Sequence, residues 1–154
     1  MKAKTIVMTV AICLVLGAVC FADDVQMGTW KLNEAKSKLA AGGPKNTTVV
    51  YEAAGDKVKV TVDGVDADGK PAHNEWTGSF DGKDYAVTGD PASDTRAYKK
   101  VDDHTLDMTI KKDGKTTVTG KIVVAADGKS RTVSTSGTDA KGKKMMNTSV
   151  YDKQ

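Results

Sequence analysis

Few residues in this sequence have the types needed for acid–base catalysis, and they are scattered. His73 lies in an alternating, strand-like stretch, which predicts that its side chain faces solvent. His104 follows Asp102 and Asp103 at a predicted turn. No nearby serine has the spacing expected of a catalytic triad with either histidine. We therefore predict no catalytic residues and no enzyme activity.

The carboxylates partly resemble a calcium-binding loop. Asp66, Asp68 and Glu75 fit ligand positions of such a loop, and Gly69 fits its sharp turn. However, Gly64 stands where the first carboxylate ligand is needed. The sequence also has no zinc-ligand spacing and no glycine-rich phosphate loop. We therefore predict no metal site and no cofactor.

Arg96 and Tyr98 have residue types that suit recognition of a polar group. They are two positions apart, so they lie on the same face of a strand. If that face is inward, the pair could hold the polar head of a ligand while aliphatic residues hold its tail. If it is outward, Arg96 would pair with a surface carboxylate. The inward alternative gives a candidate ligand-binding set of Arg96, Tyr98, Tyr51, Val60, Trp76 and Met108.

A repeated turn signal separates the elements that must position these residues. The tripeptide Asp-Gly-Lys occurs four times, beginning at positions 68, 81, 113 and 127. Asp-Gly supplies the positive φ angles of tight hairpin turns, and the Asp side chain can bond the turn backbone. The repeat therefore predicts hairpins between sequential antiparallel strands.

Between the turns, apolar and polar residues alternate with a period of two, as in 57–62 and 105–111. This pattern is typical of strands with one face in water. The predicted strands are residues 26–33, 46–53, 57–64, 70–80, 84–89, 94–101, 104–112, 115–126, 129–138 and 143–152. One short helix is predicted within 33–40, with Asn33 as its cap.

The spacing of the turns favours a barrel over a sandwich. Successive turn glycines, such as Gly69 and Gly82, recur every 13 or 14 residues. This leaves strands of about ten residues, or roughly 33 Å, which is long for a sandwich. We therefore predict an all-β, antiparallel up-and-down meander that closes into a barrel of about eight to ten strands, with at most one short helix after the first strand. The predicted inward residues are Trp30, Val49, Tyr51, Val58, Val60, Val62, Trp76, Phe80, Tyr85, Val87, Leu106, Met108, Ile110, Val118, Ile122, Val124, Val133 and Val150.

The segment Gly28-Thr29-Trp30-Lys31-Leu32 resembles the opening-strand motif of lipocalins and fatty-acid-binding proteins, in the calycin superfamily. The resemblance implies that Gly28 lets the chain bend and that Trp30 packs across one end of the barrel. Val150-Tyr151 is similar to the last strand of fatty-acid-binding proteins. More broadly, the chain resembles small exported bacterial lipocalin-like proteins, most of which have no assigned activity.

Two departures from the fatty-acid-binding pattern limit what the resemblance implies. Those proteins have two helices between their first two strands, whereas residues 33–45 have room for one short helix. They also carry an arginine two positions before the last-strand tyrosine, where this chain has Ser149. We therefore do not carry fatty-acid binding over to this chain.

The first residues have the features of a secretory signal peptide. Lys2 and Lys4 precede an apolar run over 6–20, and Cys20-Phe21-Ala22 supplies small residues for a cleavage site. A membrane anchor and a lipid-anchored Cys20 are weaker alternatives. We predict that cleavage after Ala22 removes residues 1–22 and leaves a lipocalin-like β-barrel domain at 23–154, secreted or periplasmic.

Cleavage would also change the composition. It removes both cysteines and two of the 23 basic residues, which leaves 21 basic against 20 acidic residues and a net charge of +1. Because the two signs are interspersed, we expect no nucleic-acid partner.

Two function classes follow. The first is a binding module for a small, mainly apolar ligand in the cell envelope. The alternative is a structural or protein-interaction barrel with a closed interior and no ligand. We expect a monomer with no membrane span after cleavage.

Overall fold

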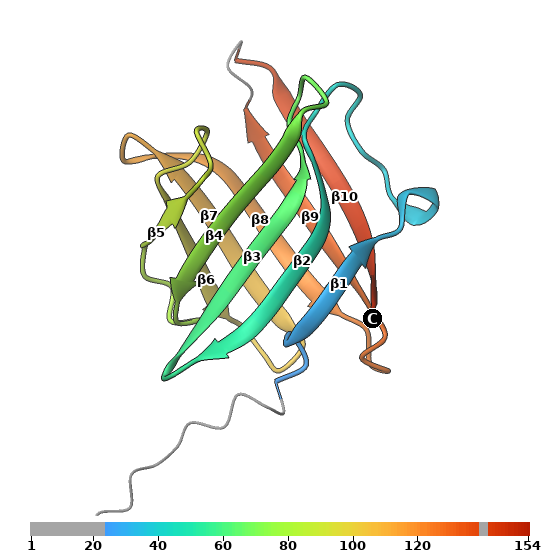
Figure 1. Ribbon diagram of the computed structural model, residues 1–154, viewed down its shortest axis with the longest axis vertical. Coiled ribbons are helices and arrows are strands. Elements are labelled where there is room, and N and C mark those ends of the chain that lie inside the picture. The colour runs from blue at the N-terminus through green and yellow to red at the C-terminus, as the bar shows by residue number, and fades with distance from the viewer. Residues whose placement is uncertain (1–23, 139–141) are drawn as a thin grey trace, which may run out of the picture.

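The alternating segments form the wall of a closed barrel (Figure 1). The computed structural model describes residues 24–138 and 142–154, so the predicted signal peptide lies outside the described residues. The strands are β1 (Gly28–Leu32), β2 (Lys45–Ala54), β3 (Lys57–Val65), β4 (Pro71–Gly78), β5 (Tyr85–Thr88), β6 (Thr95–Lys100), β7 (Thr105–Lys112), β8 (Lys115–Val124), β9 (Ser130–Thr138) and β10 (Lys144–Lys153). The predicted all-β meander barrel is confirmed.

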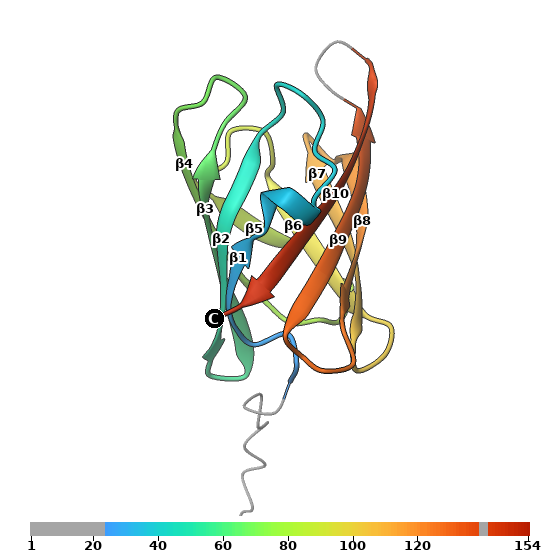
Figure 2. The same cartoon turned by 90° about the vertical axis from the view of Figure 1, so that its right-hand side faces the viewer.

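Every strand pairs antiparallel with its neighbours in sequence, and β1 pairs with β10 to complete the circle. Trp30 lies opposite Val49 of β2 on one side and Lys153 of β10 on the other. Figure 2 shows β10 beside β1, with β9 on its far side. Closure pairs the first strand with the last, so neither of them is left as a free edge of the sheet.

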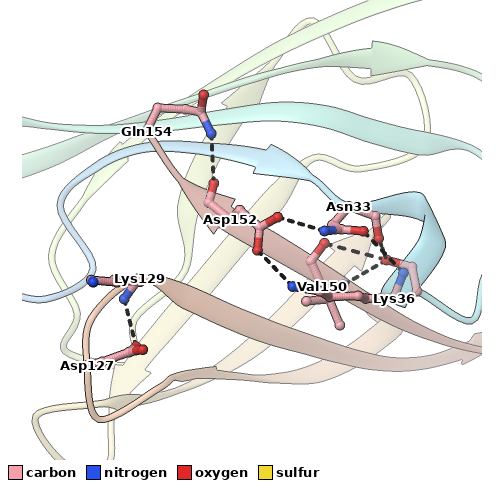
Figure 3. A network of polar contacts seen from close by, with 8 residues as sticks. Asn33, Lys36, Asp127, Lys129, Val150, Asp152 and Gln154 are labelled. Carbon is pink, nitrogen blue, oxygen red and sulfur yellow. Dashed lines mark hydrogen bonds and ion pairs between the residues drawn. The ribbon is translucent and has the colours of Figure 1, made fainter.

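The connection between β1 and β2 contains one 3₁₀ turn, η2 (Glu34–Lys36), in place of the expected short helix. The side-chain oxygen of Asn33 accepts a hydrogen bond from the Lys36 backbone N–H at 3.2 Å, and Asn33 Nδ2 donates to Asp152 Oδ2 at 2.7 Å (Figure 3). These contacts tie the connection to β10. No helix in residues 24–138 and 142–154 is long and apolar enough to cross a membrane.

One end of the barrel is covered by the segment that precedes β1. Trp30 is fully buried there, and its Nε1 donates a hydrogen bond to the Gln26 carbonyl at 2.9 Å. Gln26 is itself buried, and its Nε2 donates to the His104 carbonyl at 3.2 Å. Gly28 has a φ of 107°, which favours glycine at the point where the chain enters the first strand. In Figure 1 this segment and the C-terminus lie at the same end of the barrel.

The core follows the predicted alternation except in the last strand. Val150 was expected inward, but it is only partly buried and lies outside the core, whereas Tyr151 is buried. The reason is the register of β10, which places Tyr151 opposite Leu32 of β1 and Arg131 of β9. Because side chains alternate along a strand, an inward Tyr151 turns Val150 to the other face.

Candidate functional site

The barrel interior contains a cavity of about 220 Å³. Its apolar wall comes from inward residues of β1, β2, β3, β7, β8 and β9, and its polar groups come from β2, β6, β9 and β10. Its lining is Leu32, Leu39, Pro44, Lys45, Asn46, Val49, Tyr51, Val62, Arg96, Tyr98, Met108, Ile110, Val118, Ile122, Arg131, Val133, Thr135, Asn147, Ser149 and Tyr151. Pro44 and Asn46 are exposed, so the cavity reaches the surface beside the β1–β2 connection.

The structure brings four of the six predicted ligand-binding residues to this cavity, namely Tyr51, Arg96, Tyr98 and Met108. Val60 is fully buried in the core but does not line the cavity. Trp76 does not line it either. The motif residues Gly28 and Trp30 also lie outside the lining.

Trp76 fills the interior beside the cavity instead. Its ring meets Tyr98 edge-on at a centroid distance of 4.8 Å and stacks on Phe80 at 6.4 Å. Its Nε1 donates a hydrogen bond to the Arg96 carbonyl at 2.8 Å. This aromatic group occupies much of the space that a wide barrel encloses, which explains why the cavity is small.

Arg96 faces the interior, so the surface alternative for this residue is wrong. It is 5% exposed, because Arg96 and Tyr98 lie on the same face of β6 and this face points inward. Its Nη2 donates to Asn74 Oδ1 at 3.3 Å, whereas its Nε has no hydrogen-bond partner among the described residues. Burial alone would lower the pKa of Arg96, but the neighbouring Tyr98 and the Asp90 carboxylate hold that pKa above its usual value.

Arg131 on β9 is a buried cavity residue that the sequence analysis did not identify. It is 2% exposed, and its guanidinium carbon lies 4.7 Å from the ring centroid of Trp30, 4.8 Å from that of Tyr51 and 5.0 Å from that of Tyr151. Its Nε and Nη1 have no hydrogen-bond partner among the described residues. Alternation could have found it, since Val133 was expected inward and Arg131 is two positions earlier.

Tyr51 and Tyr151 of the cavity are neutral hydrogen-bonding groups. Burial raises the pKa of Tyr51 above its usual value, and the nearby Tyr98 raises it further, although Arg131 opposes both effects. Burial also raises the pKa of Tyr151. Both phenols therefore keep their protons at physiological pH, and Tyr151 already donates its hydroxyl hydrogen to the Asn46 carbonyl at 3.0 Å.

The two histidines lie away from the cavity. His73 is an exposed residue of β4, as predicted, and its Nδ1 lies 2.6 Å from Asp63 Oδ1. His104 precedes β7 in a turn, where its backbone N–H donates to Asp102 Oδ1 at 2.8 Å. Within the described ranges, no three His, Cys, Asp or Glu side chains come together as metal ligands.

Comparison with known proteins shows the fold alone. No protein-family model matches this chain, and no curated protein matches it. The chain is similar to a solved structure described as "Structure of EF1p2_mFAP2b bound to DFHBI", with a TM-score of 0.50 and 12% sequence identity. The match covers 84% of this chain and 94% of that chain.

Proposed function

We propose that this protein is a lipocalin-like binding module that holds a small ligand with an apolar body inside its barrel. The cavity is the observation that carries this proposal. Aliphatic side chains such as Val62, Ile110 and Ile122 supply an apolar wall, and the arginines and tyrosines supply a few polar groups. Small-molecule sites commonly have this composition. The fold's likeness to a structure bound to DFHBI supports the same class of function.

The size of the cavity limits the ligand. A volume of about 220 Å³ equals that of about seven liquid water molecules, and it lies below the usual range for drug-sized ligands. A long acyl chain would not fit without displacing the wall or the aromatic group around Trp76. The ligand is therefore small and compact.

The residues around the cavity favour binding over catalysis. Its lining contains no histidine, carboxylate or cysteine among the described residues, so the hydroxyls of Thr135 and Ser149 have no histidine or carboxylate base beside them in the lining to activate them. The signal features of residues 1–22 support export, which would place this binding module in the envelope or outside the cell.

Native mass spectrometry of the full protein from its own host tests the proposal directly. We expect a small molecule that stays bound under native conditions and is released on denaturation. Titration with the neutral fluorophore 2-naphthamide should show roughly one site. Met108→Trp should weaken that binding about tenfold or more, because the new ring fills the cavity, whereas Val123→Trp, on the 41% exposed Val123 of β8, should not.

The alternative function is tested by the same titration. Absence of both a retained molecule and naphthamide binding would overturn the binding proposal. Equal naphthamide affinity in the wild type and the Met108→Trp variant would do so too, because the dye would then sit on the outer surface. The alternative function, a barrel that serves as a structural or protein-interaction scaffold, would then replace the binding function.

A further inference from the structure

The cavity has an excess of positive charge. Three cationic side chains line it, Lys45, Arg96 and Arg131, and no carboxylate of the described residues does. Lys45 already has a counter-ion, since its Nζ lies 2.9 Å from Glu34 Oε2 in the β1–β2 connection. Neither arginine forms an ion pair with any Asp or Glu of the part of the chain that the structure describes. Neither buried arginine therefore has a carboxylate within ion-pair distance, and the Asp90 carboxylate acts on Arg96 only from farther away.

Burial of an uncompensated charge is strongly unfavourable, and buried charges are normally paired and hydrogen-bonded. Here three buried guanidinium nitrogens also lack an acceptor, namely Arg96 Nε and Arg131 Nε and Nη1. A guanidinium presents its N–H groups as a planar fork that matches the oxygen atoms of a carboxylate or phosphate. The acceptor that best matches these N–H donors is therefore an oxyanion.

The aromatic rings around Arg131 satisfy only part of this need. Trp30, Tyr51 and Tyr151 stabilise the charge through their ring faces, so Arg131 also supports the packing of the closed end. A ring face attracts a cation but gives no lone pair in the plane of the guanidinium. Arg96 has no such ring contact among the described residues, and its hydrogen bond to Asn74 is long, at 3.3 Å.

From these observations we infer that the ligand is a small organic oxyanion, whose acid group is bound by Arg96 and Arg131 while its apolar body lies against the aliphatic wall. This inference rests on the proposed function and specifies its ligand class. Tyr51 fits the assignment, because it lines the same cavity as a neutral group, and a neutral hydroxyl can donate a further bond to an anion.

The test compares matched fluorescent probes that differ in one group, namely 2-naphthoate, 2-naphthyl phosphate and the neutral 2-naphthamide. At low salt, wild-type protein should bind at least one of the two anions about tenfold or more tightly than the amide, the effect of one good charge-assisted contact. Preference for the carboxylate or for the phosphate identifies which oxyanion the site takes, and either preference supports the inference.

Substitution of each arginine shows whether that arginine produces the preference for an anionic probe. Arg96→Gln and Arg131→Gln should each weaken the preferred anion about tenfold and change amide affinity by about twofold or less. Lys121→Gln is the matched control, because Lys121 is an exposed cation on β8 that pairs with Asp107 at 2.9 Å outside the cavity. It should leave both affinities unchanged.

The outcomes separate the two proposals. Equal binding of the amide and both anions by wild-type protein would overturn the oxyanion assignment and leave the binding function intact. The same holds if Arg96→Gln retains the full preference for the anion. Failure of all three probes to bind would overturn the binding function itself, and the oxyanion assignment with it. The comparison on wild-type protein decides the question even if the Arg131→Gln variant does not fold.

Discussion

Arg131 on β9 lies over the indole ring of Trp30 on β1, with 4.7 Å between the guanidinium carbon and the ring centroid. The two strands flank β10, so this contact bridges the strand pairings that close the barrel. The Nε1 of Trp30 also donates a hydrogen bond to the Gln26 carbonyl. The opening-strand tryptophan and the missed arginine therefore form one unit that links the closed end to the cavity.

Trp30→Ala should destabilise the protein by about 3–5 kcal/mol, because it removes a fully buried indole and leaves a hole against Arg131. Urea denaturation of the two proteins measures the difference. Trp30→Phe is the control, since it keeps a ring and loses the Nε1–H donor, and it should be less damaging. A denaturation midpoint that hardly moves in the alanine variant would contradict the buried position of Trp30.

Gly78→Ala should destabilise the protein by about 1–3 kcal/mol through overpacking. A Cβ atom at Gly78 would lie 2.5 Å from Tyr85 Cδ2 and 2.6 Å from Trp76 Cζ2, closer than real Cβ contacts, so one of these rings would have to shift. Thr77→Ala, at the exposed neighbouring position, should have a smaller effect. Near-ultraviolet circular dichroism should also change for Gly78→Ala, because the Trp76–Tyr85 edge contact at 5.7 Å is disturbed. An unchanged spectrum and midpoint would count against this packing.

His73 should make stability depend weakly on pH. Its hydrogen bond to Asp63 raises the pKa of His73 above 6.5, so the folded state binds a proton that the unfolded state releases. The stabilisation is fully present below pH 6.5 and is lost as the pH rises through the raised pKa. His73→Gln should therefore lower the urea midpoint more at about pH 6 than at about pH 9, and added salt should reduce the difference. An equal effect at both pH values would show that the pair contributes no charge-dependent stability.

Exported protein should begin at Asp23, because Ala22 ends a small-residue site after the apolar run. N-terminal sequencing of the protein from culture medium or a periplasmic extract measures this. Detection of Met1, or of an acylated Cys20, would support one of the membrane-attached alternatives instead.

The strands and the closed meander could be predicted because both depend on local signals. Asp-Gly turns set where the chain reverses, and the period of two sets which side chains share a face. The face of β6 follows from the same rule, yet the sequence left open whether Arg96 points inward. When a charged residue and an aromatic residue share one face of a strand, the sequence of that strand alone does not show whether the face points into the barrel.

The last strand shows a second reason for the limits of prediction. Val150 is the more apolar neighbour of Tyr151, so hydropathy alone favours Val150 as the inward residue. The register with β1 and β9 decides otherwise, and register is a property of pairing between distant segments. Arg131 was missed for a related reason, since burial of a charge makes sense only once three rings from other strands surround it.

The pairing of β1 with β10 has a consequence for the order of folding. The first strand finds one of its two partners only in the last residues of the chain, through contacts such as Leu32 with Tyr151. Contacts between such distant segments form slowly, because the entropy of closing a long loop must be overcome first. Until residues near 153 are available to pair, the chain can form hairpins but cannot complete the circle, and β1 keeps an unpaired edge. Pairing of β10 with β1 is thus the step that closes the barrel.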